Sequence, residues 1–203
     1  TGSITFTGAA GGSTRLGDLS IVSAASVTTA AVTAATIGQT AGTGTSSFGA
    51  LNTNAAGGID LNGTAISLTG AVTTTTGGPV TITNSGALTI AAAADMSLDG
   101  AFTQDGAGAV STAGDITTTS DTITFGAATT LAGNVALSTG AGAGNIAFSS
   151  TVNASSAGVE DLTLTAGTGS ITLTGAVGGT TRLGDLSIVS ATNVTTAAVT
   201  AAT

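Results

Sequence analysis

Carboxylates are the most numerous chemically reactive side chains in this 203-residue chain, which has ten Asp and Glu, two Lys and Arg, and no His or Cys. Calcium and other hard cations bind several oxygen ligands, so acids that the fold brings together could hold one. The candidate pairs are Asp95 with Asp99, Asp115 with Asp121, and Glu160 with Asp161. The simpler interpretation is that these carboxylates cap turns and keep the chain soluble. We therefore expect no cofactor and no dedicated metal site, with calcium as the one ion that these acids could bind.

The same acids do not resemble an active site. Glycoside hydrolases place two carboxylates on either side of the bond that they cleave, whereas the acids here are spread along the whole sequence. There is also no His, Lys, Tyr or Trp to assist catalysis or to stack on a sugar. We predict that the protein is not an enzyme and has no catalytic residue.

Basic side chains are almost absent. The formal net charge is −8, and a surface of this kind repels polyanions, because nucleic-acid binding needs Lys and Arg to replace counterions. Arg15 and Asp18 recur as Arg182 and Asp185, and the members of each pair are three positions apart. We interpret them as a local ion pair or a turn brace, and we expect no nucleic-acid partner.

The ends of the sequence repeat each other. Residues 1–36 and 168–203 differ at five of 36 positions, with Thr168 corresponding to Thr1. We interpret residues 1–167 as one full tandem repeat unit and residues 168–203 as the start of the next, within a longer array. Covalent arrays of near-identical units are a common way to build length, so the expected partners are further copies of the same unit.

A second, shorter pattern lies inside the unit, in which two large apolar residues flank a small or hydroxylated one. This alternation is typical of short strands that bury one face. The second apolar residues recur about every 22 residues, at Leu61, Ile82, Phe102, Phe125, Phe148 and Leu173. That spacing predicts a single-stranded parallel β-helix, in which the three Phe residues of the series stack on one another. A β-sandwich is the alternative, but nothing in a sandwich requires so regular a spacing.

This spacing also predicts the size of the unit. The series from Leu61 to Leu173 contains five steps, and the rest of the unit holds two or three further coils. One unit should therefore contain seven or eight coils and rise by about 34 to 38 Å at roughly 4.8 Å per coil.

Membrane insertion of this segment is not expected. No apolar stretch approaches the roughly 18 to 20 residues that cross a bilayer as a helix. A transmembrane barrel would need aromatic girdles, and the chain has neither Trp nor Tyr.

Two other self-assembling or surface functions are weaker alternatives. Thr-x-Thr triplets are found in ice-binding solenoids, but here their spacing is irregular: Thr5/Thr7, Thr81/Thr83, Thr122/Thr124, Thr163/Thr165 and Thr172/Thr174. Functional amyloids also stack units of about 20 residues, but they depend on Gln and Asn ladders, and this chain has only Gln39 and Gln104.

Three segments carry a resemblance to a known family: Gly133 to Phe148, Glu160 to Val177, and Gly17 to Ala24. They resemble the repeats of filamentous-haemagglutinin-type adhesins, giant bacterial proteins exported by two-partner secretion or as autotransporters. The resemblance implies a right-handed β-helix, a bacterial cell-surface or secreted location, and a role in adhesion, aggregation or matrix. Our hypothesis is a structural segment of an extracellular fibre, sheath or adhesin stalk that provides length and self-assembly. Laterally associated identical filaments are the further partners that this hypothesis includes. A receptor-binding adhesin surface is the alternative.

Overall fold

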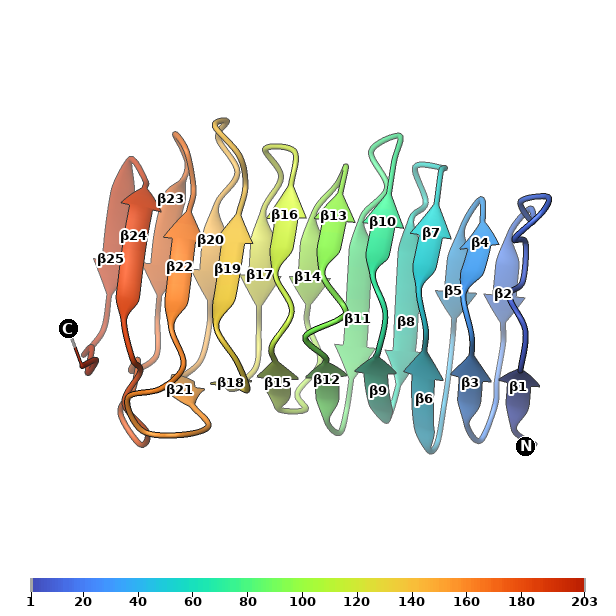
Figure 1. Cartoon of the computed structure of the whole chain (residues 1–203), viewed down its shortest axis with the longest axis horizontal. Helices are drawn as coiled ribbons and strands as arrows, with labels where there is room; N and C mark the ends of the chain where they lie inside the picture. Colours follow the sequence, from blue (N-terminus) through green and yellow to red (C-terminus); the bar gives the residue numbers. More distant parts are fainter. Residues whose placement is uncertain (1, 203) are drawn as a thin grey trace.

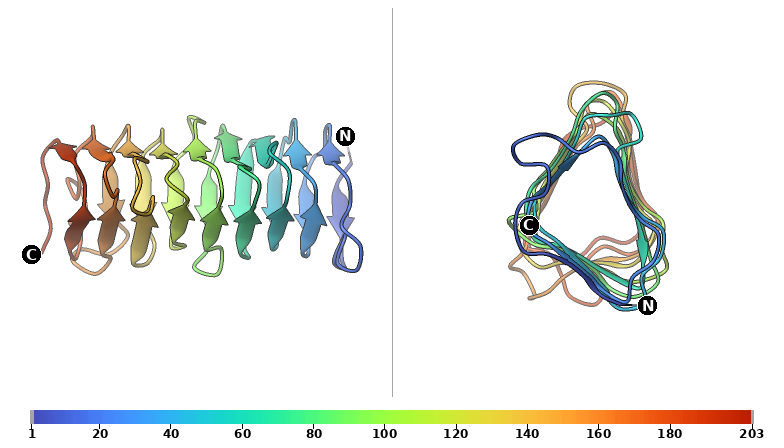
Figure 2. Two further views of the ribbon diagram at one scale, coloured as in Figure 1. Left: turned by 90° about the horizontal axis from the view of Figure 1, so that it is seen from above. Right: turned by 90° about the vertical axis from the view of Figure 1, so that its right-hand side faces the viewer.

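The computed structural model describes residues 2–202, which form 25 short strands in three parallel sheets. The strands stack into a straight rod with a triangular cross-section (Figure 1; Figure 2). We name the sheets A, B and C in the order in which each coil visits them. Sheet A contains β1 (Ile4–Phe6), β3 (Val27–Thr29), β6 (Thr45–Phe48), β9 (Ala65–Leu68), β12 (Leu88–Ile90), β15 (Val110–Thr112), β18 (Thr129–Leu131) and β21 (Val152–Ala154).

The other two sheets run beside sheet A along the rod. Sheet B contains β4 (Val32–Ala34), β7 (Leu51–Thr53), β10 (Val72–Thr74), β13 (Met96–Leu98), β16 (Ile116–Thr118), β19 (Val135–Ser138), β22 (Leu162–Thr165) and β24 (Leu186–Ser190). Sheet C contains β2 (Leu19–Ile21), β5 (Ile37–Gln39), β8 (Ile59–Gly63), β11 (Val80–Asn84), β14 (Phe102–Gln104), β17 (Ile123–Phe125), β20 (Ile146–Phe148), β23 (Ser170–Leu173) and β25 (Asn193–Thr196).

The period-two alternation produces this architecture strand by strand. In β12, Leu88 and Ile90 are buried whereas Thr89 between them is exposed. Leu88 lies between Ile66 of the coil before and Val110 of the coil after. Stacking the same pattern on every coil joins the apolar side chains into one continuous core. Every strand pairing among the described residues is parallel, which rejects the sandwich and confirms the predicted parallel β-solenoid.

The coil length also agrees with the prediction. Leu19 and Val194 are eight coils apart in sheet C. Their sequence separation divided by eight gives about 22 residues per coil. No helix among residues 2–202 has the length and apolar character needed to cross a bilayer.

The predicted column of three Phe residues is wrong at one position. In sheet C, Phe102 lies between Val80 and Ile123, and the column of Ile82, Phe125 and Phe148 contains Gln104 instead. The Phe125 and Phe148 rings stack 4.9 Å apart at 6°, whereas Phe102 contacts Phe125 from the neighbouring column at 5.1 Å and 47°. Positions i and i+2 of one strand both face inward, so the alternation alone could not distinguish position 102 from position 104.

Several corners between sheets B and C contain left-handed backbone. Gly58 has a φ of 59°, and a Cβ at this position would lie 2.0 Å from the Pro79 carbonyl oxygen of the next coil. Thr76 (61°) and Ser120 (73°) adopt the left-handed region at the same corner of other coils. Because residues with a Cβ are strained in this region, both turns carry local backbone strain.

Candidate functional site

Four acids and one asparagine form a ladder at the corner that leads into sheet B. An Asp or Asn precedes five successive sheet B strands, at Asp95, Asp115, Asn134, Asp161 and Asp185. At the first four of these positions, the side-chain Oδ1 accepts a hydrogen bond from a backbone N–H of the next coil. The donors are Asp115 N to Asp95 (2.9 Å), Ala136 N to Asp115 (2.8 Å), Asp161 N to Asn134 (3.1 Å) and Asp185 N to Asp161 (2.8 Å).

This Asx ladder assigns a structural role to acids that we considered as calcium ligands. Each of these four oxygens satisfies an N–H at or beside a corner, where the regular strand ladder is interrupted. Asn replaces Asp at one position without loss of the pattern, so the ladder needs an oxygen acceptor and not a charge. The arrangement agrees with the turn-capping interpretation.

The expected calcium pairs are not brought together by the fold. Asp95 and Asp99 flank β13, so four residues of extended chain separate them by about 13 Å. Asp115 and Asp121 flank β16 in the same way. Among residues 2–202, no group of three or more acids is placed to hold a metal ion. Calcium binding stays a prediction.

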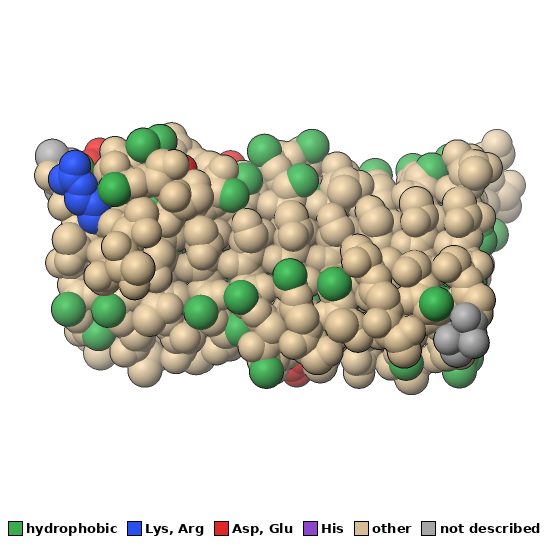
Figure 3. All heavy atoms as spheres, turned by 90° about the horizontal axis from the view of Figure 1, so that it is seen from below, with side chains coloured by type: hydrophobic (Ala, Val, Ile, Leu, Met, Phe, Trp, Pro, Cys, Tyr) green, Lys and Arg blue, Asp and Glu red, His purple; other side chains and the backbone are tan. Residues whose placement is uncertain are grey.

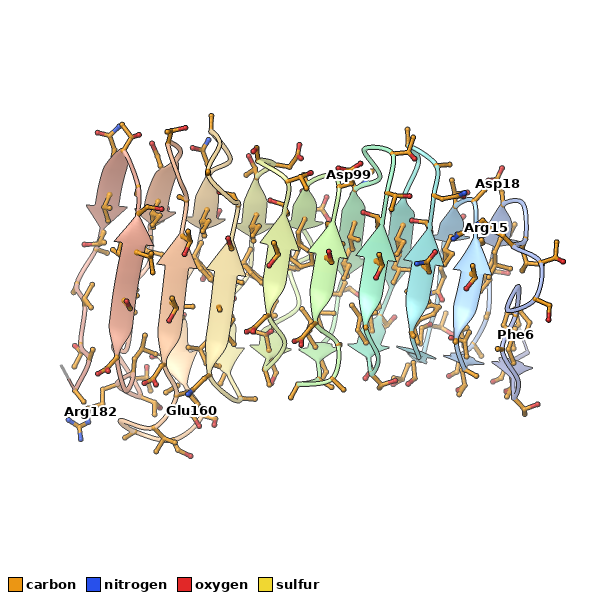
Figure 4. All side chains as sticks on the ribbon, turned by 45° about the horizontal axis from the view of Figure 1, so that its top comes forward. Phe6, Arg15, Asp18, Asp99, Glu160 and Arg182 are labelled. Carbon is orange, nitrogen blue, oxygen red and sulfur yellow. The ribbon has the colours of Figure 1, made fainter. Side chains whose placement is uncertain are left out.

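Asp99 lies at the other end of β13, at the corner between sheets B and C (Figure 4). Its Oδ2 accepts a hydrogen bond from Gly77 N, and its Oδ1 accepts one from Thr119 Oγ1, both at 2.9 Å. These bonds, that from Gly77 first and that from Thr119 second, hold the pKa of Asp99 below its usual value. Asp99 therefore ties its own coil to the coils on both sides.

Glu160 is the one buried acid among residues 2–202, with 6% of its surface exposed. Burial raises its pKa, but hydrogen bonds from Ser155 Oγ (2.7 Å) and Ser156 N (2.9 Å) outweigh burial and leave the pKa lowered. Its neighbour Asp161 belongs to the exposed Asx ladder. The two carboxylates thus have separate partners, and Glu160 closes the loop that follows β21.

Arg15 is a brace that spans three coils. Its guanidinium donates to the Ala34 carbonyl at 2.7 Å, to the Asn52 carbonyl at 3.0 Å, and to Asn52 Oδ1. Asp18 instead accepts a hydrogen bond from Thr36 Oγ1 at 2.7 Å. Within residues 2–202 Arg15 and Asp18 form no ion pair, and Arg15 braces neighbouring coils instead of a local turn. The partners of Arg15 lie one and two coils away, a distance that local sequence reasoning does not reach.

A buried amide network, which the sequence pattern did not predict, lies beneath the corner between sheets C and A. Gln104 Nε2 donates to Asn84 Oδ1 (2.8 Å) and to the Gly106 carbonyl (2.7 Å), and Gln104 Oε1 accepts from Gly126 N and Ala127 N (3.0 Å each). Asn84 Nδ2 donates to the Gly86 and Gly108 carbonyls. The one available signal was a polar residue at a position where the alternation expects an apolar one.

A shallow groove of about 330 Å³ lies outside this network. Asn62, Thr83 and Asp105 line it from three successive coils, and Thr83 Oγ1 donates to Asp105 Oδ1 at 2.6 Å. Among the described residues that line the groove, Asp105 alone is charged. The groove therefore offers polar contacts to a ligand, but not the two facing carboxylates of a glycoside hydrolase.

Hydroxyl groups dominate the outward positions of sheet A. They form a column with one member per coil: Thr5, Thr28, Ser47, Ser67, Thr89, Ser111 and Thr130. The Thr-x-Thr pairs, in contrast, are distributed over all three sheets, with Thr5 in sheet A, Thr163 in sheet B and Thr81 in sheet C. One face of the rod accordingly carries mostly neutral polar atoms, scattered hydrophobic side chains and few charges (Figure 3).

No family model, curated protein or solved structure matches this chain significantly.

Proposed function

We propose that residues 1–167 are the repeat unit of an extended fibre, sheath or adhesin stalk on the surface of a bacterial cell, and that the unit provides length. The observation that carries this proposal is the way in which the duplicated segment supports the residues that follow it. In the first copy, β5 pairs on β2 with Ile37 opposite Leu19, and β8 pairs on β5. The second copy presents the equivalent strand, β24, with Leu186 at the position of Leu19. A further copy of residues 37–167 can therefore continue the same ladder.

Such an array is stiff because each coil is joined to the next by backbone hydrogen bonds in three sheets and by the continuous core. Each coil adds roughly 4.8 Å, so ten units would extend for about 370 Å. Each unit also covers the open sheet edges of its neighbour, which would otherwise pair with other chains. Length and protected edges are what a fibre requires.

The bacterial surface location rests on the resemblance to filamentous-haemagglutinin-type repeats. A parallel β-solenoid with three sheets and coils of this length fits that resemblance. The scarcity of basic residues fits a protein exposed to proteases, because trypsin-like enzymes have only Arg15 and Arg182 to cleave.

An adhesin surface is the second candidate. The groove lined by Asn62, Thr83 and Asp105 favours it, because amide, hydroxyl and carboxylate groups are suited to sugar hydroxyls. In this case the rod would bind a partner along its length as well as extend.

Immunogold labelling of intact cells with antibodies against this chain tests the proposal. We expect label along extended surface filaments. Label confined to the cytoplasm, or to compact particles, would contradict the proposed function. Glycan binding that is lost in Asp105→Ala, but kept in the groove-distant Asp99→Ala, would favour the adhesin surface.

A further inference from the structure

The two copies of the duplicated segment have the same local structure. Ile4 pairs with Val27 in the first copy, and Ile171 pairs with Val194 in the second. The isolated bridge of Ala10 with Val32 likewise corresponds to that of Val177 with Val199.

Hydrogen bonds and turns are repeated in the same way. Thr33 N donates to the Ala10 carbonyl, and Thr200 N donates to the Val177 carbonyl, both at 2.8 Å. Gly11 and Gly178 have left-handed φ values of 75° and 68°. The two segments are thus the same structural element and not merely the same sequence.

The copies nevertheless lie on different faces of the rod. The first copy places Ile4 in sheet A and Leu19 in sheet C, whereas the second places Ile171 in sheet C and Leu186 in sheet B. The segment around Ala10, which pairs with sheet B, has its equivalent at Val177, which pairs with β21 of sheet A. Every element has moved back by one face. In Figure 4, Arg15 lies in the upper half of the view and Arg182 at its lower edge, as expected for copies on different faces.

The number of faces in one unit explains this shift. From β1 to β23 the chain advances by 22 strands. It also passes one further face of sheet B, the Ala10–Leu16 segment, which is bridged to β4 but is not a named strand. One unit, residues 1–167, therefore occupies 23 faces, or seven and two-thirds coils. This value lies between the seven and eight coils expected from the sequence. A unit longer by one face would return to the same sheet.

We infer that successive units of the array are rotated by one third of a turn about the fibre axis, so that each surface residue appears on all three faces in turn. This inference rests on the proposed function, because it requires an array. One unit rises by about 37 Å, and three units complete 23 coils in about 110 Å. Val22 and its equivalent Val189 illustrate the arrangement: both are exposed, at 71% and 62%, but the first follows β2 of sheet C and the second lies in β24 of sheet B.

The rotation determines what a partner meets. A ligand or an identical filament that approaches from one side encounters a given residue once in three units, about every 110 Å. Partners on the other two sides meet the same residue one or two units further along. The array therefore presents one binding surface in three directions.

Electron cryomicroscopy of a three-unit rod tests this inference. The rod is the present chain followed by two further copies of residues 37–203. Val22→Cys, made also at the next two equivalent positions, gives one thiol per unit for a gold label, because the chain contains no Cys. We expect labels about 37 Å apart along the axis, on sheets C, B and A in succession. Labels that all lie on one sheet would overturn the rotation while leaving the fibre intact. A chain that does not form one continuous rod would contradict the proposed function itself.

A matched control removes one whole coil and no part of another. Val80 pairs with Ile59, so deletion of residues 60–80 from each unit joins equivalent positions. The unit then has six and two-thirds coils. The label spacing should fall by about 4.8 Å, while the order of the sheets stays the same. A changed order of the sheets would show that the coil count does not set the rotation.

Discussion

The substitution Gln104→Leu best distinguishes what the structure predicts from what the sequence pattern predicts. Gln104 is fully buried in a column whose other members include Ile82, Phe125 and Phe148. The alternation alone predicts that leucine completes the apolar column and stabilises the rod. The structure predicts the opposite, because the amide of Gln104 satisfies four polar groups.

The magnitude follows from the hydrogen bonds that leucine cannot make. Gly126 N keeps its bond to the backbone carbonyl of residue 104 (2.8 Å), so three groups lose a partner: Ala127 N, the Gly106 carbonyl and Asn84 Oδ1. About 1 to 2 kcal/mol for each unmet buried group gives about 3 to 6 kcal/mol. Additional apolar burial of the leucine side chain offsets about 1 to 2 kcal/mol of this loss of stability. The net loss should be about 2 to 4 kcal/mol.

Amide hydrogen exchange measures this loss at the site itself, which matters because solenoids can open locally. We expect the protection of Ala127 N–H to fall by about 30- to 900-fold, since each 1.36 kcal/mol is a factor of about ten, and the urea midpoint to decrease. Ile82→Leu, at the preceding position of the column, is the control and should cost less than about 1.5 kcal/mol. Equal or greater stability of Gln104→Leu would refute the assigned network.

Substitutions at three further positions test the corners and the acids. Ser120→Gly relieves a left-handed residue and should stabilise the chain by about 0.5 to 1 kcal/mol in urea denaturation; a lower midpoint would contradict the strain. Asp115→Ala should cost about 1 kcal/mol by removing the acceptor of Ala136 N, whereas Asp115→Asn should cost little. If calcium instead holds this ladder, both variants would lose a calcium-dependent rise in melting temperature that chelation removes from the parent chain. Glu160 has a lowered pKa, so its stabilising contribution is present above its unfolded-state pKa and is lost as the pH falls through the folded value. Glu160→Gln should therefore flatten the loss of thermal stability between neutral and acidic pH, and an unchanged pH profile would contradict this role.

The fold was predictable because its two causes are both periodic. Alternation within strands such as Leu88–Ile90, and recurrence of such strands once per coil, act along the whole rod. Positions within a strand were less predictable, as Phe102 shows, because a shift of two residues preserves the inward direction. The polar partners were the least predictable. Arg15 and Gln104 bind groups about one or two coils away, and such distances depend on the register of the stack.

The acids illustrate the same limit. Sequence proximity suggested Asp95 with Asp99, but a strand lies between them and places them at different corners. In a solenoid the true neighbour is one coil away, so Asp95 meets Asp115. The rotation between units was also hidden, because it depends on the number of faces in one unit, which the sequence pattern alone does not give.

The axial repeat of the filament tests the central claim, that this unit extends as a stacked solenoid, most directly. Fibre diffraction and mass-per-length measurements on filaments from cells, or on the three-unit rod, provide it. We predict a strong axial spacing of about 4.8 Å and a rise of about 37 Å for each unit. Residues 1–167 contribute their proportionate share of the 18.6 kDa mass of the whole chain. The measured mass per length therefore gives the rise of one unit. A unit that occupies less than about 20 Å or more than about 50 Å of filament, or filaments without the axial spacing of about 4.8 Å, would contradict the claim.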